Sequence, residues 1–233
     1  MKVHNVEQGT EAWLALRLGI PTASMFSQIL TPGGKLSKSA RKYAYRLTAE
    51  RILNRPLDSI EGLEWVARGK ELEPDAVKLY EFEHEVRTIP VGFITTDDGR
   101  TGVSPDRLVG DVGLLEIKCP APHTHIGYML DGFGADYKPQ VQGQLHVAER
   151  EWTDFLSYSD EMPRVILRTV RDEPYIQLLR DALDEFNDMR EEMFVKALAE
   201  GAFVVQREVK TMHQQAYASS RMSDADEFGG AFA

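Results

Sequence analysis

The chain has 233 residues, of which 42% are hydrophobic and 27% charged, a composition typical of a globular protein. No apolar run approaches the roughly 20 residues of a membrane-spanning helix. Residues 1–13 lack the apolar core of a signal peptide, so we expect a cytoplasmic protein without membrane association. Its single cysteine excludes an internal disulfide and a four-cysteine zinc or iron–sulfur site within one chain.

The formal net charge is −10, which by itself argues against a nucleic-acid partner, but the charge is unevenly distributed. Residues 1–56 hold nine Lys/Arg against three Asp/Glu, a balance of +6 that leaves −16 for residues 57–233. Local fields decide contacts with phosphate, so a basic N-terminal region can still bind nucleic acid. The candidates to contact a DNA backbone are Lys35, Lys38, Arg41 and Lys42. The alternative is a solvated helix face.

Helices are predicted in the N-terminal part of the chain. Residues 22–30 and about 37–53 are typical of two helices joined by a Gly/Pro turn. Residues 63–85 carry apolar side chains at near-helical spacing. Pro74 lies inside this segment, and we expect it to interrupt the helix and to start a new turn.

From residue 87 the pattern changes to short apolar runs separated by tight turns, which is typical of strands. We expect three consecutive strands at 87–96, 102–110 and 112–119, a helix at 138–149, two strands at 152–159 and 164–170, and a long amphipathic helix at 172–200. This order predicts an α/β fold with a central, mostly mixed β-sheet flanked by helices. One domain is expected over residues 1–210, followed by a disordered C-terminal tail at 211–233.

Three charged side chains fall where a strand favours apolar residues: Asp106 on the second of the consecutive strands, and Glu116 and Lys118 on the third. Glu116 and Lys118 are two residues apart, so they project from the same face of the sheet. A matching hairpin register would bring Asp106 close to Glu116, and two such carboxylates repel unless a cation lies between them. Oxygen ligands select Mg²⁺ or Mn²⁺. The alternative is a set of solvated charges at a sheet edge.

Cleavage of a phosphodiester is the chemistry that suits this arrangement. Hydrolysis of phosphate esters needs accelerations of up to about 10¹⁷-fold or more, whereas a lone general base contributes about 10²–10⁴. A metal ion that activates water and neutralises a phosphoryl oxygen supplies a further contribution. A lysine ammonium beside the metal could position a water, help to deprotonate it, or stabilise developing charge.

Four motifs follow one another over most of residues 10–160: "WLALRLGIPTAS" at 13–24, "RGKELEPDAVKLYE" at 68–81, "SPD" with "LLEIKCP" at 104–120, and "DYKPQVQGQLHV" at 136–147. A Pro-Asp followed after nine residues by Glu-Ile-Lys is the signature of the PD-(D/E)XK nucleases. The four motifs together resemble the phage lambda exonuclease family, also called the YqaJ-type viral recombinases. The resemblance implies a restriction-endonuclease-like core and a Mg²⁺-dependent 5′-to-3′ exonuclease. Such an enzyme digests one strand of linear double-stranded DNA and leaves 3′ single-stranded tails for recombination by strand annealing.

The resemblance also implies roles for individual residues. Catalysis would depend on two Mg²⁺ ions per active site, with Mn²⁺ as a substitute. The implied metal ligands are Asp106, Glu116, Glu73 and the Ile117 carbonyl. Lys118 becomes the catalytic lysine. Gln140 and Tyr137 align with the wall of the active site, where Tyr137 is also a candidate DNA contact. For Glu73, Gln140 and Tyr137 the alternative is an ordinary position on a helix surface or in the core.

Arg17, Ser24 and Ser104 align with the family's pocket for the 5′-phosphate of DNA, and a guanidinium with two hydroxyls suits phosphate geometry. The alternatives are a surface salt bridge for Arg17 and a helix cap for Ser24. The family has a further arginine shortly after Lys-Cys-Pro, and this chain has Thr124 there, with a histidine on either side. Either a histidine substitutes for that arginine or another Lys/Arg supplies the charge.

The resemblance further implies double-stranded DNA ends as substrate, a ring-shaped homotrimer, and a single-strand annealing protein as partner. Two alternatives stay open. The first is another PD-(D/E)XK nuclease, such as a structure- or sequence-specific endonuclease. The second is a non-catalytic DNA-binding protein with a relic site, against which the intact Asp/Glu/Lys set argues.

Overall fold

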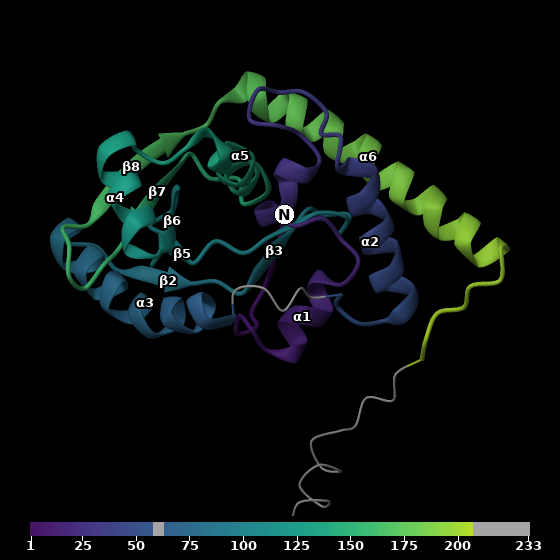
Figure 1. The fold of residues 1–233 in the computed structure, drawn as a ribbon, viewed down its shortest axis with the longest axis horizontal. Coiled ribbons are helices and arrows are strands. Elements are labelled where there is room, and N and C mark those ends of the chain that lie inside the picture. Colours follow the sequence, from purple (N-terminus) through teal and green to yellow (C-terminus); the bar gives the residue numbers. More distant parts are fainter. Residues whose placement is uncertain (58–62, 207–233) are drawn as a thin grey trace, which may run out of the picture.

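A computed structural model describes residues 1–57 and 63–206 of the chain (Figure 1). The elements in chain order are β1 (Lys2–His4), α1 (Glu11–Arg17), the 3₁₀ helix η1 (Ala23–Gln28), α2 (Ala40–Leu53), α3 (Leu63–His84), β2 (Thr88–Pro90), β3 (Phe93–Thr95), β4 (Gly102–Val103), β5 (Arg107–Val109), β6 (Gly113–Lys118), α4 (Pro122–Asp131), the 3₁₀ helix η2 (Ala135–Tyr137), α5 (Lys138–Val147), β7 (Trp152–Ser157), β8 (Val165–Val170) and α6 (Glu173–Ala199).

The strands form two sheets. The larger has the order β2-β5-β6-β7-β8, and within it β6 and β7 run parallel while the other neighbours are antiparallel. A parallel pair needs a long crossover, which α4, η2 and α5 supply. The smaller sheet has the order β1-β3-β4 and is antiparallel. The predicted mixed sheet flanked by helices is confirmed, whereas the second sheet was not predicted.

Two of the predicted strands are wrong as single strands, because each divides between the two sheets. The run 87–96 becomes β2 and β3, and the chain changes sheet at Gly92, where an added Cβ would overlap the Val6 carbonyl oxygen. The run 102–110 becomes β4 and β5, separated by residues 104–106. Pro105 has no N–H to donate to a ladder. This break releases Asp106 from strand pairing.

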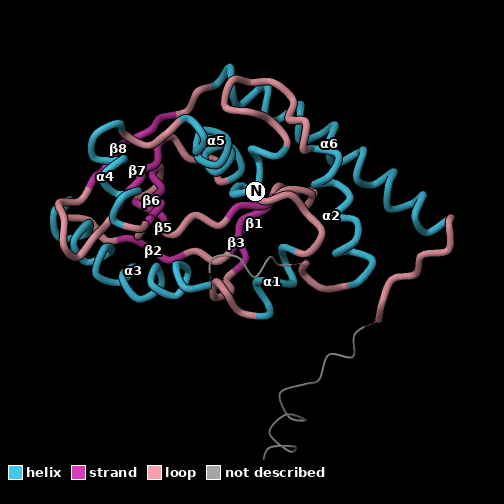
Figure 2. Tube along the Cα trace, viewed as in Figure 1, coloured by secondary structure: helices cyan, strands magenta, loops and turns pink. Residues whose placement is uncertain are grey.

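Helices cover both faces of the larger sheet, and Figure 2 shows α3 and α5 on opposite sides of it. Along β6 successive side chains alternate between the two faces. Leu114 packs in the main core cluster, which also contains buried residues of α5 and α6. Leu115 and Ile117 pack on the other face with Tyr80 and its neighbours on α3. Glu116 lies between these positions, so its side chain points to the α5 face.

The expected interruption at Pro74 is also wrong, because α3 continues through it from Leu63 to His84. Proline removes one hydrogen bond from the helix, and the turns that follow are held by burial of Ala76, Val77 and Tyr80 against the sheet. Within residues 22–30 the chain forms the short η1, Ala23–Gln28, in place of the expected helix. The sequence patterns also missed β1, α1 and α4.

Among the described residues, no helix combines the length and the apolar character needed to cross a bilayer. The prediction of a disordered tail at 211–233 falls outside the described residues.

Candidate active site

The break between β4 and β5 places Asp106 beside the middle of β6. Asp106 Oδ2 accepts a hydrogen bond from the Ile117 backbone N–H at 2.6 Å. Lys118 Nζ donates to Glu116 Oε1 at 2.6 Å, as expected for side chains on one face of a strand. The structure therefore brings together the three charged residues that the sequence singled out.

The main chain of Ile117 faces the side of β6 on which Asp106 lies. In an extended strand, the N–H and C=O of one residue point to the same side. The Ile117 N–H points to Asp106, so the Ile117 carbonyl oxygen faces Asp106 as well. A backbone oxygen is thus available beside the Asp106 carboxylate.

Glu116 is 3% exposed and is surrounded by donors. In addition to Lys118, Oε1 accepts from Gln140 Nε2 at 2.6 Å, and Oε2 accepts from Gln144 Nε2 at 2.7 Å. Gln140 was expected at the site, but Gln144 was missed. The signal that could have found it is the spacing, because residues four apart lie on one face of a helix such as α5.

The charges of this cluster do not balance. Burial and the charge of Glu116 raise the pKa of Asp106 well above its ordinary value, against the opposing effects of Lys118 and the Ile117 N–H. Burial lowers the pKa of Lys118, but the Glu116 and Asp106 carboxylates outweigh it and raise that pKa overall. Two carboxylates face one ammonium, so the site favours a further positive charge, either a proton on Asp106 or a bound cation.

Glu73, the third predicted carboxylate, lies on α3. Its charge is close enough to contribute to the raised pKa of Asp106. Within residues 1–57 and 63–206, however, no three His, Cys, Asp or Glu side chains gather closely enough to hold a metal ion. The structure brings Glu73 into the electrostatic neighbourhood of Asp106, and its role as a direct ligand stays a prediction.

Aromatic side chains flank Lys118. The Tyr137 and Tyr128 hydroxyls share a hydrogen bond at 2.7 Å. The rings of Tyr137 and Phe133 pack on Phe155 with centroids 4.7 and 4.0 Å apart, and Lys118 Nζ lies 5.9 Å from the Phe155 centroid. Tyr137 therefore borders the site, and its contact with DNA stays a prediction. No sequence motif pointed to Tyr128.

The predicted phosphate-binding residues come partly together. One terminal nitrogen of Arg17 donates to Ser104 Oγ and the other to Thr22 Oγ1, both at 3.4 Å. The Trp13 ring lies 4.0 Å from the guanidinium, and its Nε1–H donates to Ser104 Oγ at 3.0 Å. Because Ser104 Oγ accepts two hydrogens, its own proton is directed elsewhere and can be donated to an anion. Trp13 and Thr22 were not among the predicted site residues.

Ser24 is exposed in η1, two residues after Thr22. The alternative that Ser24 caps this helix is wrong, because Thr22 occupies the N-cap position. Thr124 lies on α4 and is partly exposed, between the exposed His123 and the buried His125.

His125 does not substitute for the family's missing arginine. Its ring is fully buried, with Nδ1 at 2.7 Å from Ser157 Oγ and Nε2 at 3.0 Å from the Pro163 carbonyl oxygen. Both ring nitrogens are therefore committed to the fold, which makes His125 a core residue.

The basic residues proposed to contact DNA lie apart from the carboxylate cluster. They are exposed on the loop before α2 and on its first turn, and α2 packs beside α6 (Figure 1). Arg41 is oriented by a hydrogen bond from its Nε to the Tyr45 hydroxyl at 2.9 Å. A DNA contact by Lys35, Lys38, Arg41 and Lys42 stays a prediction.

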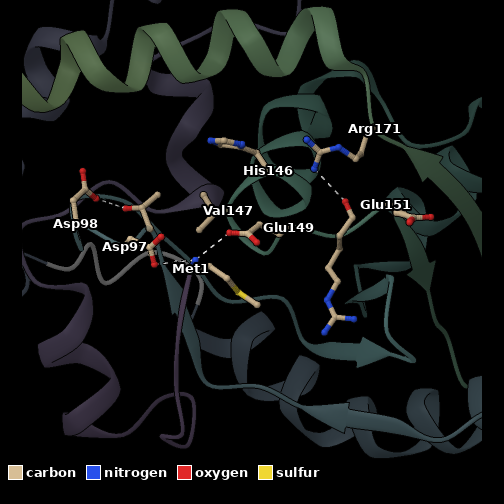
Figure 3. Close-up of a pocket in the computed structure, with 10 residues that line it drawn as sticks. Met1, Asp97, Asp98, His146, Val147, Glu149, Glu151 and Arg171 are labelled. Atoms are coloured by element: carbon tan, nitrogen blue, oxygen red, sulfur yellow. Dashed lines mark hydrogen bonds and ion pairs between the residues drawn. The ribbon is translucent and has the colours of Figure 1, made fainter.

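A hollow of about 670 Å³ lies elsewhere on the surface (Figure 3). The Met1 ammonium lies 3.0 Å from both Asp97 and Glu149 at its rim. Burial and the charge of Arg171 lower the pKa of His146 there. None of the predicted site residues lines this hollow. The carboxylate–lysine cluster on the central strand β6 is therefore the better candidate for catalysis.

Fold and cluster together define a class: the protein has the restriction-endonuclease-like fold, with its charged cluster on the central strands of the mixed sheet. Residues 12–151 match the model of the YqaJ-like viral recombinase domain, and the chain belongs to this family. The predicted family resemblance is confirmed.

Solved structures agree with this assignment. The alkaline exonuclease LHK-Exo from Laribacter hongkongensis is 32% identical, with a TM-score of 0.74 over 83% of this chain and 98% of that one. LHK-Exo in complex with dAMP gives 33% identity and a TM-score of 0.75 over the same shares, 83% and 98%. A phage-related exonuclease from Haemophilus somnus 129PT, at 16% identity and a TM-score of 0.61 over 76% and 96%, supports the fold alone. No curated protein sequence matched the chain.

Proposed function

We propose that this protein is a Mg²⁺-dependent exonuclease that digests one strand of linear double-stranded DNA from its 5′ end and leaves 3′ single-stranded tails for recombination. The observation that carries the proposal is the buried cluster of Asp106, Glu116 and Lys118, in which two carboxylates face one ammonium. Membership of the YqaJ-like family and the likeness to the alkaline exonuclease LHK-Exo support the same activity.

The residues of the cluster fit a divalent cation. Asp106 and Glu116 offer carboxylate oxygens, Ile117 offers a carbonyl oxygen, and hard cations such as Mg²⁺ and Mn²⁺ prefer oxygen ligands. When bound, such a cation would supply positive charge to a phosphoryl oxygen and lower the pKa of a water. Two ions per site and ligation by Glu73 belong to the proposal as well.

The chain's own residues orient the reaction. Glu116 is held by three donors, so its carboxylate has one orientation. Lys118 has an ammonium with three protons, of which one is donated to Glu116, so the others can hold a water or a phosphate oxygen. This arrangement is prepared before substrate arrives, which is what electrostatic catalysis requires.

A 5′-phosphate would occupy the donors around Arg17. The guanidinium and the Ser104 hydroxyl suit a phosphate dianion. Ser104 is two residues from Asp106, so the short segment 104–106 couples a bound chain end to the cleavage site. This coupling favours removal of nucleotides from the 5′ end.

Digestion of end-labelled linear duplexes with Mg²⁺ or with a chelator tests the proposal. We expect the 5′ strand to be degraded only with Mg²⁺ and faster from 5′-phosphate than from 5′-hydroxyl ends, while covalently closed circular duplex stays intact. Cleavage of the circle would favour the endonuclease alternative. Binding without any digestion would favour the non-catalytic one.

The homotrimeric ring and the single-strand annealing partner are also part of the proposal. A ring around DNA would keep the enzyme on its substrate between cleavage events. Light scattering of the purified protein measures its mass, and a monomer at working concentration would contradict the ring.

A further inference from the structure

Three glutamines on α5 have different partners. Gln140 and Gln144 both donate to Glu116, whereas Gln142 points away from it. Gln142 and Gln144 are 2% and 1% exposed, so each must find its hydrogen-bond partners inside the protein. The hydrogen-bond partners of Nε2 and Oε1 in each amide distinguish a structural role from a functional one.

Gln142 is satisfied at both ends. Its Nε2 donates to the Val170 carbonyl oxygen at 2.9 Å, and its Oε1 accepts from the Asp172 N–H at 2.8 Å. The amide therefore joins α5 to the end of β8 and to the N-cap of α6. This is the pattern of a residue retained for the fold.

Gln144 is satisfied at one end only. Its Nε2 donates to Glu116 Oε2 at 2.7 Å, while its Oε1 has no hydrogen-bond partner among the described residues. A buried carbonyl oxygen without a partner destabilises a protein. A methionine or leucine of similar size would avoid that cost, so the reason for an amide here is the Glu116 carboxylate to which it donates.

The charge of Glu116 decides the orientation of the Gln144 amide. If the amide were reversed, its oxygen would face a carboxylate oxygen at hydrogen-bond distance, and the two would repel. With Nε2 toward Glu116, a donor meets an anion and forms a charge-assisted hydrogen bond. Gln144 Oε1 is therefore left without a partner because Nε2 is the end that faces Glu116.

We infer that Gln144 is a positioning residue that fixes the Glu116 carboxylate for a divalent cation, an inference that rests on the proposed function. Oε1 of Glu116 already has two donors, Lys118 and Gln140, whereas Gln144 is the donor to Oε2 in the described part of the chain. Gln144 therefore sets the plane of the carboxylate. Partners that hold a metal ligand in this way typically contribute 10–100-fold to metal affinity or activity.

The test compares Gln144→Met with the matched control Gln142→Met on the same helix. Isothermal titration with Mn²⁺ measures metal affinity, and thermal unfolding in EDTA measures stability without metal. We expect Gln144→Met to bind Mn²⁺ about 10–100-fold more weakly and to lose a few degrees of Tm in EDTA as well, because Glu116 Oε2 is left buried without its donor. Gln142→Met should lower Tm by about 5 °C or more, because it leaves two buried main-chain groups unpaired, and should keep wild-type affinity.

Three outcomes would overturn the inference: wild-type Mn²⁺ affinity in folded Gln144→Met, a loss of Mn²⁺ affinity in Gln142→Met as large as that in Gln144→Met, or failure of both Gln144→Met and Gln144→Leu to fold. Gln144→Leu repeats the test with a second apolar side chain and should give the same pattern. If the wild type itself bound no divalent cation and digested no DNA, the proposed function would fail. Wild-type binding and digestion combined with unchanged Gln144→Met would contradict the positioning role alone.

Discussion

Two buried carboxylates lie on opposite faces of the same pair of strands, and they are neutralised in different ways. Asp154 on β7 is 1% exposed and points toward α3. It accepts two hydrogen bonds from Arg168 at 2.8 Å and one from the Tyr80 hydroxyl at 2.6 Å. Arg168 also lies 3.7 Å from the Trp152 ring centroid.

Glu116 on β6 is equally buried but belongs to a cluster in which two carboxylates share one lysine. The Asp154 group contains one negative and one positive charge, and its hydrogen bonds are complete. The Glu116 group has two carboxylates for one ammonium, and burial and mutual repulsion raise the pKa of Asp106 well above its ordinary value. The comparison indicates that a buried carboxylate whose charge is matched by a partner stabilises the fold. A buried cluster with more carboxylates than cations indicates a functional site.

The same substitution at the two clusters should have opposite effects, and the largest is expected at Asp106. Asp106→Asn keeps an oxygen to accept the Ile117 N–H but removes one of the carboxylates proposed to bind the metal. We expect the rate of DNA digestion to fall by about 10²–10³-fold or more, the scale of losing one electrostatic stabiliser. Because one of two repelling carboxylates is removed, the Tm in EDTA should not fall. A large loss of Tm would mean that Asp106 is structural.

At Asp154 the same change should mainly reduce stability. Asp154→Asn removes the charge that pairs with Arg168 and leaves the buried polar groups imperfectly matched. We expect a loss of about 3 kcal/mol in the free energy of unfolding, the lower end of the range for breaking a buried ion pair, since Arg168 is half-exposed. Urea denaturation measures this loss. Digestion per folded molecule should stay at the wild-type rate, and a loss of activity in the folded variant would place Asp154 among the functional residues.

Metal addition should stabilise only the proteins with an intact Asp106 cluster. Mg²⁺ at 100 times its dissociation constant stabilises the folded state by about 2.7 kcal/mol, which corresponds to roughly 5–10 °C in Tm for a chain of this size. We expect this shift in wild type and in Asp154→Asn but not in Asp106→Asn. Thermal scans with Mg²⁺ and with EDTA measure it. An equal shift in all three proteins would locate the cation elsewhere.

The smallest effect is expected at Tyr80. Tyr80→Phe removes one hydrogen bond to Asp154 and leaves the bidentate contact with Arg168, so the free energy of unfolding should fall by about 1–2 kcal/mol. Urea denaturation detects the change, and digestion should be unaffected. An unchanged midpoint would show that Arg168 alone satisfies Asp154.

The predictable part of the site was the part encoded locally. Glu116 and Lys118 share a face because side chains on a strand alternate, and the turn between β5 and β6 returns the chain to Asp106. Gln144 lies one helical turn from Gln140. It was missed because its role depends on a hydrogen bond to Glu116, which lies on another element. The Tyr80, Asp154 and Arg168 group was not predictable, since its members come from α3, β7 and β8.

The fold followed the same rule. The positions of α2, α3, α5 and α6, and of the strands β6, β7 and β8, came close to expectation because hydrophobic periodicity acts over a few neighbouring residues. The division of runs 87–96 and 102–110 between two sheets was missed, because an apolar run does not reveal which strand will pair with it. Pro74 was misjudged because packing against the sheet outweighed a local helix-breaking tendency.

From its sequence alone, this protein's α/β class, its family and the identity of its charged residues were determined, since motif order and side-chain alternation are properties of the chain itself. The tertiary structure alone decided which donors surround each carboxylate. Pairing β7 with β8 gives Asp154 an arginine, and packing α3 on one face of the sheet gives it a phenol. Packing α5 on the other face gives Glu116 two glutamine amides beside the lysine of its own strand. The physical reason is that charge balance inside a protein depends on residues distant in sequence that only packing brings within hydrogen-bond reach.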